Sequence, residues 1–287
     1  MCYIRVSLFF TTFALHVRGR DPALRIIGGS DADDEAHAYI ARIQLHLTMP
    51  TLAEYGIALS HFEHLCSCAI LTPFWTLTAG HCVQENITDS YVNEKIGEVK
   101  FEYIMIYGPI KKTTTAKILQ WMRHPAYKRS IADLLFYVYN DIGLIKTEEV
   151  HLRLYGHISA MDYATLIGHE AIATGHGKMN ISGIISSATS MGKPLQKLEV
   201  LMVKCSSAYE HVRPKLCISR RCDKQSHVCP GDSGGPLLHS SGIVGVNTAA
   251  PTIACHPLNN VWFSEVGGIT PVSPYVDWIT HTINKDV

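Results

Sequence analysis

Three short segments of the chain contain the side chains of a nucleophilic hydrolase. The segment 231–236 (Gly-Asp-Ser-Gly-Gly-Pro) contains Ser233, the segment 77–82 contains His81, and the segment 140–144 contains Asp141. Serine is a poor nucleophile near neutral pH, so a neighbouring imidazole must accept its proton, and a carboxylate must hold that imidazole in the right tautomer. These three residues therefore predict a serine nucleophile with its base and its orienting acid.

The order of these residues along the chain narrows the kind of hydrolase. Taken singly, the serine segment could be an ordinary turn, His81 a structural histidine and Asp141 an exposed carboxylate. Together they run His, Asp, Ser, which differs from the order in subtilisins and in α/β-hydrolases and argues against an esterase of the latter fold. The three motifs resemble those of the chymotrypsin/trypsin family of serine proteases.

The resemblance implies an all-β fold of two six-stranded antiparallel β-barrels, chymotrypsin-like, with a C-terminal α-helix and the active site between the barrels. The sequence pattern is also typical of an all-β protein, because short apolar or β-branched runs recur between turn signals. These runs cover residues 39–47, 101–107, 116–122, 195–203 and 242–247. The fold expectation therefore rests on both the family motifs and the strand pattern.

Two of these segments carry more specific expectations. The imperfect alternation in 195–203 predicts a strand that is buried on one side at its start and on both sides near its end. Apolar residues at three- and four-residue steps predict a helix over 273–284, with Ser273 as its cap and Pro274 in its first turn.

The composition fits a globular protein with a sizeable core. The 287 residues are 47% hydrophobic and 17% charged, and 25 basic residues balance 25 acidic ones. There is no basic excess to attract nucleic acid or an anionic membrane, and no apolar run approaches the roughly 18 residues of a spanning helix. We therefore expect no nucleic-acid partner, no membrane partner and no cofactor.

The beginning of the chain and its cysteines predict export. Arg5 precedes a mostly apolar run at 6–17, as in a secretory signal. Nine cysteines and glycosylation sequons at Asn86 and Asn180 fit an oxidising, glycosylating route. We expect residues 1–25 to be a signal peptide and short activation propeptide, residues 26–287 to be the protease domain, and the mature protein to be extracellular.

The resemblance also assigns roles around the serine. The backbone N–H groups of Gly231 and Ser233 would form the oxyanion hole. The segment 25–29 (Arg-Ile-Ile-Gly-Gly) looks like the activation junction of the family, which implies a zymogen cleaved after Arg25. The new α-ammonium of Ile26 would then pair with Asp232 and organise the oxyanion hole and the specificity pocket.

Six cysteines map onto disulfides of the same family. The implied pairs are Cys66 with Cys82, Cys205 with Cys217, and Cys229 with Cys255. Cys68 and Cys222 have no partner in the family pattern, and Cys68 stands at a customary glycine position. A zinc site built from Cys66, Cys68 and the nearby histidines is the competing interpretation, but a disulfide at Cys66 would leave too few thiolates, so no metal is expected.

The specificity pocket departs from the trypsin-like pattern. Trypsin-like members have Asp six residues before the nucleophile, where this chain has His227. A neutral imidazole supplies no fixed negative charge, so we expect non-tryptic specificity, with a chymotrypsin-like preference for large apolar residues. Small residues, or acidic ones if His227 is protonated, are alternatives. Ala250 and Asn260 would narrow the pocket, and Pro230 restricts the oxyanion loop.

The sequence thus predicts a secreted serine endopeptidase, made as a zymogen and monomeric. Its expected partners are protein or peptide substrates, an activating protease and protein protease inhibitors. The alternative is a catalytically silent homologue that acts as an extracellular binding or regulatory partner. Such homologues usually lack a triad residue, whereas this chain retains all three; the altered pocket and Pro230 keep the alternative open.

Overall fold

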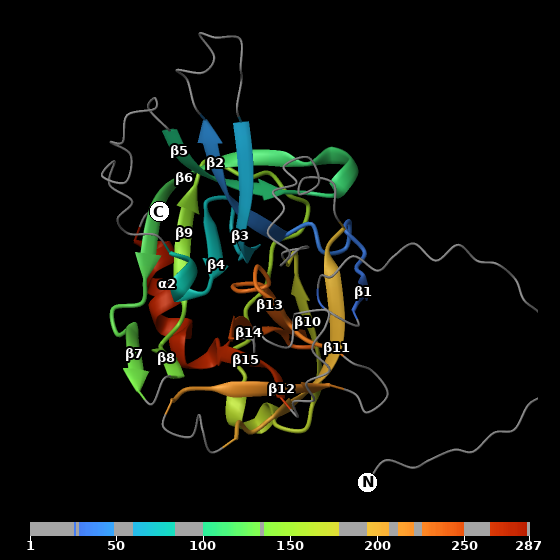
Figure 1. Ribbon diagram of the computed structural model, residues 1–287, viewed down its shortest axis with the longest axis vertical. Coiled ribbons are helices and arrows are strands. Elements are labelled where there is room, and N and C mark those ends of the chain that lie inside the picture. The colour runs from blue at the N-terminus through green and yellow to red at the C-terminus, as the bar shows by residue number, and fades with distance from the viewer. Residues whose placement is uncertain are drawn as a thin grey trace, which may run out of the picture.

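The fold of the 287-residue chain is that of a computed structural model. The structure describes Ile26 and residues 29–48, 60–83, 100–132, 135–177, 194–206, 212–220, 226–249 and 265–285. Almost all regular structure in these ranges is antiparallel strand, arranged as two barrels (Figure 1). Among the described residues, no helix is long and apolar enough to cross a membrane.

The first barrel is closed by six strands in the order β2-β3-β4-β9-β6-β5. They are β2 (Ile40–Thr48), β3 (Ser60–Ile70), β4 (Trp75–Thr78), β5 (Lys100–Tyr107), β6 (Thr114–Arg123) and β9 (Gly143–Thr147). Its interior is filled by side chains such as Ile43, Met105 and Ile145, none of which is exposed. A hairpin of β7 (Lys128–Ala132) and β8 (Leu135–Tyr139) leads into β9.

The second barrel contains the C-terminal strands, in the order β11-β10-β13-β14-β15-β12, and the pairing of β11 with β12 closes it. The strands are β10 (Glu170–Gly175), β11 (Gln196–Val203), β12 (Leu216–Arg220), β13 (Pro236–His239), β14 (Gly242–Ala249) and β15 (Glu265–Pro271). A short strand β1 (Ser30–Asp31) adds to β11. The expectation of two six-stranded antiparallel barrels is confirmed.

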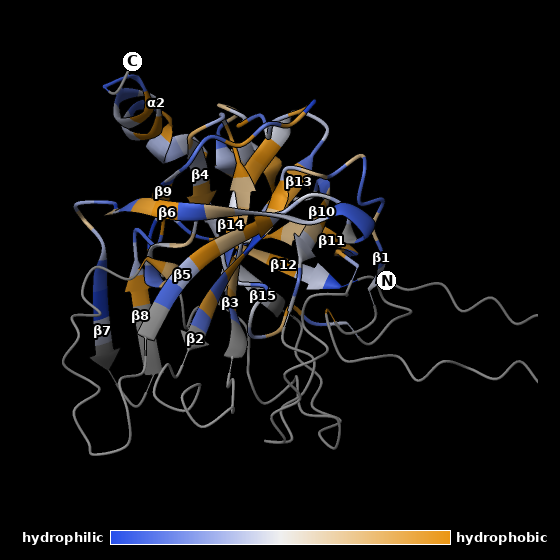
Figure 2. Ribbon diagram, turned by 90° about the horizontal axis from the view of Figure 1, so that it is seen from above, coloured by the Kyte–Doolittle hydropathy of each residue, from blue (hydrophilic) through white to orange (hydrophobic). Residues whose placement is uncertain are grey.

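A shared apolar layer joins the barrels and the C-terminal helix. Leu77 and Leu144 from the first barrel pack in one cluster with Val246 from the second and with Ile279 from α2 (Val276–Asn284). In Figure 2, hydrophobic colours gather on interior strands such as β13, whereas α2 has one hydrophobic and one hydrophilic side. This layer fixes the two barrels against each other, which matters because the candidate site draws on both.

The C-terminal helix is confirmed, with Pro274 in its opening 3₁₀ turn, but the expected cap at Ser273 and the expected two-sided burial at the end of 195–203 were wrong. The α-helix begins at Val276, and Ser273 lies in a preceding 3₁₀ turn (Ser273–Tyr275), where its hydroxyl accepts a hydrogen bond from Tyr163 N instead of capping the helix. Strand β11 alternates between buried residues and partly or fully exposed residues to its end, with Leu201 38% exposed. The barrel covers only one face of β11, so its outer apolar residue stays at the surface.

Disulfides brace both barrels. Cys66 in β3 is bonded to Cys82, 16 residues on, and Cys205 is bonded to Cys217, 12 residues on. Cys229 is also disulfide-bonded, and its expected partner Cys255 lies outside the described residues.

Removing the Cys66–Cys82 disulfide with a double serine variant is expected to lower the free energy of unfolding by about 3 kcal/mol, because the crosslink restricts the unfolded chain. Urea unfolding of both proteins measures this loss. The Cys205→Ser/Cys217→Ser variant, with a loop of similar length, is the matched control and should lose a similar amount. Unchanged stability in the Cys66/Cys82 variant would show that native packing alone holds β3 to the following turn.

Candidate active site

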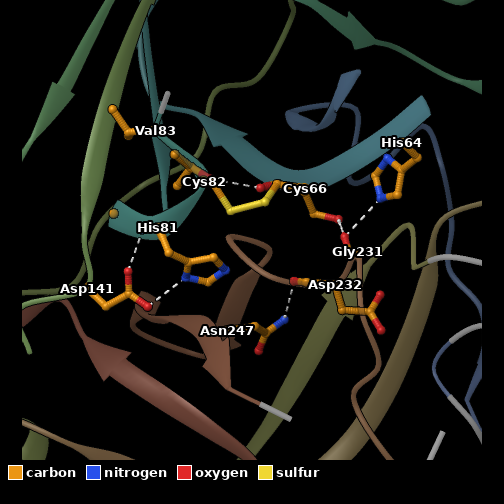
Figure 3. Close-up of a disulfide and its surroundings, with 12 residues drawn as sticks. His64, Cys66, His81, Cys82, Val83, Asp141, Gly231, Asp232 and Asn247 are labelled. Atoms are coloured by element: carbon orange, nitrogen blue, oxygen red, sulfur yellow. Dashed lines mark hydrogen bonds and ion pairs between the residues drawn. A yellow bond between two sulfur atoms is a disulfide. The ribbon is translucent and has the colours of Figure 1, made fainter. Parts of the chain in front are cut away.

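His81 and Asp141 are joined by two hydrogen bonds at the edge of the first barrel (Figure 3). His81 lies in a 3₁₀ turn, η1 (Gly80–Cys82), soon after β4, and Asp141 lies between β8 and β9. Asp141 Oδ1 accepts from the backbone N–H of His81 at 2.7 Å, and Oδ2 bonds Nδ1 of the imidazole at 2.8 Å. Because a carboxylate only accepts, Nδ1 carries the proton and the lone pair of the neutral ring lies on Nε2.

The turn before β9 explains why Asp141 points at His81. Asn140 has a φ of +49°, a left-handed conformation that asparagine tolerates better than most residues. Its amide group donates to Ala126 O at 2.8 Å and accepts from the Tyr275 hydroxyl at 2.9 Å. Asp141 is fully buried at its side chain, whereas 26% of the His81 side chain is exposed. The carboxylate is therefore fixed inside, and the imidazole can reach a bound molecule.

Ser233 lies in a tight turn before β13 of the second barrel, and β3 of the first barrel holds this turn. Ser67 N donates to Ser233 O at 2.8 Å, and Gly234 N donates to Asn247 O at 2.7 Å. Gly234 has a φ of +79°, and a Cβ there would lie 2.1 Å from Thr78 Oγ1, so only glycine fits. The turn thus packs against Thr78, directly upstream of the turn that carries His81.

The amides beside Ser233 are available to a ligand. Gly231 is buried with a φ of +94°, and its carbonyl accepts hydrogen bonds from Ser67 Oγ and from His64 Nε2, both at 2.9 Å. In the part of the chain that the structure describes, the N–H groups of Gly231 and Ser233 donate to no protein acceptor. Backbone N–H groups in and near a protein interior are usually paired, so two neighbouring donors with no acceptor among the described residues are uncommon.

Asp232, the residue between Gly231 and Ser233 in the sequence, is fully buried. Its Oδ1 accepts from Gly177 N and its Oδ2 from Cys229 N, both at 2.8 Å. Burial raises the pKa of Asp232 to about 7, although the two amides act in the opposite direction. No cation among the described residues pairs with it, and Ile26, 3% exposed, lies in the core of the same barrel.

The fold and these motifs agree with the comparisons with known proteins. The sequence model of the family described as Trypsin matches residues 26–279. The chain belongs to the trypsin family. Its two barrels and C-terminal helix are therefore those of the trypsin-family serine protease fold.

Relatives within the trypsin family are distant. Human "Putative trypsin-6" is 27% identical over 236 residues, covering 80% of this chain and 84% of the relative. "Serine proteinase stubble" of Drosophila melanogaster is 28% identical over 235 residues, covering 77% of this chain but only 26% of that longer protein. The solved structure of mouse neuropsin, a serine protease, is similar in fold with a TM-score of 0.62 and 18% identity, covering 90% of this chain and 100% of that one.

His227, the residue expected at the base of the specificity pocket, is buried in this trypsin-family chain. His227 is 4% exposed; burial, and then the charge of Arg220, lower its pKa. Its neighbours Ser226 and Val228 are buried as well. The other expected pocket residues, Ala250 and Asn260, lie outside the described residues, as do Arg25, Asn86 and Asn180.

The cysteines near His81 do not form a metal site. Cys66 Sγ, Cys82 Sγ and a ring nitrogen of His81 lie within 4.8 Å of one another, but the disulfide leaves no thiolate to bind a metal. No other cluster of three such ligands lies this close within the described ranges. Cys68 is a free, fully buried thiol whose pKa is raised by burial, which makes it an inert core residue.

Sequence reasoning missed two polar residues at the site. Ser67 bonds the turn around Ser233, as described above. Lys215, just before β12, donates from Nζ to Thr248 Oγ1 at 2.9 Å and is attracted by Asp141. Burial lowers the pKa of Lys215 to about 8 despite this attraction. Neither residue belongs to a motif, so only the three-dimensional packing reveals them.

Lys215→Met is expected to stabilise the protein at pH 7. The folded pKa of Lys215 lies below the ordinary value of 10.5, so between about pH 8 and 10.5 the unfolded chain binds more protons, and the folding penalty disappears as pH rises. Loss of the bond to Thr248 offsets part of the gain, which leaves on the order of 2 kcal/mol.

Urea unfolding at pH 7 and pH 10 measures the difference between wild type and Lys215→Met, which should shrink at the higher pH. Lys117→Met, at an exposed lysine, controls for the loss of one charge. A difference that is independent of pH, or a less stable variant at pH 7, would contradict the assignment.

Proposed function

We propose that the chain is a secreted serine endopeptidase, made as a zymogen, in which Ser233, His81 and Asp141 form the catalytic triad. One observation carries the proposal. The buried Asp141 fixes both the backbone and the ring of His81, while the amides of Gly231 and Ser233 donate to no acceptor among the described residues. A base with its lone pair on Nε2 and two free donors beside a serine are the parts that acyl transfer requires.

The mechanism follows from these parts. Ser233 Oγ attacks the peptide carbonyl carbon while His81 Nε2 takes the hydroxyl proton, and Asp141 stabilises the imidazolium that forms. The carbonyl oxygen becomes an oxyanion that accepts hydrogen bonds from Gly231 N and Ser233 N. The C–N bond then breaks, His81 returns the proton to the leaving amine, and an acyl-serine remains. Water, deprotonated by His81, hydrolyses the ester and restores the hydroxyl.

Cleavage after Arg25 is the proposed activation step. A new α-ammonium at Ile26 would supply the cation that the buried Asp232 lacks among the described residues. An ion pair at full burial is strong only when its hydrogen-bonding needs are met, and the amides of Gly177 and Cys229 already satisfy part of them. Asp232 lies between Gly231 and Ser233, so fixing its side chain fixes both oxyanion donors.

The proposed specificity is non-tryptic. A neutral His227 offers no negative charge to an Arg or Lys side chain, and its lowered pKa also argues against the protonated form that would attract acidic residues. We therefore propose a preference for apolar residues before the scissile bond. We further propose that the protein is monomeric and extracellular and that it is glycosylated at Asn86 and Asn180. Its proposed partners are protein substrates, an activating protease and protein inhibitors.

A peptide library tests this function. The purified chain is cut after Arg25 by an exogenous protease, which is then removed, and cleavage products are identified by mass spectrometry. We expect cleavage after large apolar residues, none after Arg or Lys, and no products from the uncut chain. Tryptic cleavage would contradict the role of His227, and activity of the uncut chain would contradict the zymogen.

A further inference from the structure

Ser67 in β3 is bonded to three other segments of the molecule. It is fully buried and lies between the disulfide residue Cys66 and the free Cys68. Its hydroxyl donates to Gly231 O at 2.9 Å and accepts from His176 N at 2.9 Å. Its backbone N–H donates to Ser233 O at 2.8 Å, and its carbonyl accepts from the Thr78 hydroxyl at 3.0 Å.

Two of these bonds reach the turn that contains Gly231 and Ser233, here called the nucleophile turn. They fix the side of this turn that faces β3. They hold the carbonyls of Gly231 and Ser233, the same two residues whose amides have no acceptor within the described ranges. Gly231 has a positive φ and no side chain, so external bonds must set its orientation. His64 Nε2 shares the Gly231 carbonyl at 2.9 Å, which gives it two donors (Figure 3).

The third bond connects this arrangement to Asp232. His176 N donates to the Ser67 hydroxyl, and the next amide, Gly177 N, donates to Asp232 Oδ1 at 2.8 Å. The single hydroxyl therefore joins a strand of the first barrel to two segments of the second barrel. Its donor and one acceptor site are both used, and Ser67 is 0% exposed, so bulk water does not compete for these bonds.

We propose that the Ser67 hydroxyl is a positioning group for the oxyanion hole: by holding the Gly231 carbonyl against β3 it keeps the amides of Gly231 and Ser233 directed at the substrate. This inference rests on the proposed peptidase function. Since the hydroxyl touches no reacting atom, its loss should affect the transition state more than substrate binding.

The test compares wild type with Ser67→Ala, both cut after Arg25 and counted by active-site titration so that only folded molecules are included. We expect kcat to fall about 10-fold, less than the 10²–10³ for loss of a direct oxyanion donor, with KM within about 2-fold. A peptide aldehyde, which forms an oxyanion on Ser233, should bind about 10-fold more weakly, since transition-state analogues report the same interactions. Ser67→Gly is the second variant if the alanine variant does not fold.

Ser159→Ala is the matched control. Ser159 is 4% exposed, and its hydroxyl also has two partners, the Ser241 hydroxyl and Met161 N, away from the nucleophile turn. It should lose stability but keep kcat and aldehyde affinity. If wild type is active but the Ser67 variants keep its kcat and aldehyde affinity, or if Ser159→Ala loses as much kcat as they do, the role of Ser67 is overturned and the proposed function is not. An inactive wild type would overturn the proposed function and this inference with it.

Discussion

Replacing Asp141 with asparagine is expected to lower kcat/KM of the activated chain by about four orders of magnitude. Both carboxylate oxygens of Asp141 are acceptors, one for the backbone N–H of His81 and one for Nδ1 of its ring. Asparagine has one acceptor oxygen and one donor amide. With the oxygen on the backbone N–H, the amide faces Nδ1 and stabilises the tautomer whose proton sits on Nε2, which cannot accept the serine proton.

Steady-state hydrolysis of a peptide substrate measures this effect. Asp162→Asn is a suitable control, because exposed Asp162 accepts from Ala164 N at the start of a 3₁₀ turn, a role that asparagine also fills. The control should keep its activity. Hydrolysis by Asp141→Asn within 10-fold of wild type would mean that the His81–Asp141 pair is structural.

Asp232→Asn is expected to prevent activation even when the bond after Arg25 is cut. Without its carboxylate the buried site cannot pair with the Ile26 ammonium, and removing one partner of a buried ion pair costs about 3–5 kcal/mol. That loss of the competent conformation corresponds to a fall in activity of between about 100-fold and a few thousand-fold. The comparison is kcat/KM of the cut variant with that of cut wild type, and Asp162→Asn is again the control.

The same ion pair predicts a pH limit for the cut enzyme. An unpaired α-amino group has a pKa of about 7.7–8.0, and pairing with Asp232 would raise it in the active form. The stabilisation is therefore complete below that range and is lost as pH rises through the raised pKa. We expect the activity of the cut wild type to fall reversibly at alkaline pH, and the residual activity of cut Asp232→Asn to show no such fall. A cut Asp232→Asn variant with full activity would show that Asp232 has no part in activation.

Much of the fold could be predicted because its signals are local. The runs at 101–107 and 242–247 became β5 and β14. The bond from Tyr163 N to the Ser273 hydroxyl and the exposure of Leu201 could not be predicted, because both depend on which segments pack there.

The polar residues that bond to the candidate site from other strands could not be predicted for a similar reason. His81, Asp141 and Ser233 stand in recognisable motifs, whereas Ser67 and Lys215 have ordinary sequence neighbours. The role of Ser67 depends on the contact between β3 and the turn around Ser233, which lies more than 160 residues away in sequence. The state of His227 likewise depends on burial and on Arg220, which the sequence does not place beside it.

The most direct test of the central claim is labelling by a fluorophosphonate probe, whose phosphorus is attacked by an activated serine with loss of fluoride. Purified protein would be compared uncut, cut after Arg25, and cut as Ser233→Ala, with disulfides intact. We predict strong labelling of the cut wild type, little of the uncut chain and none of Ser233→Ala. No labelling of the correctly cut protein would contradict the enzyme and favour a catalytically silent homologue that acts by binding.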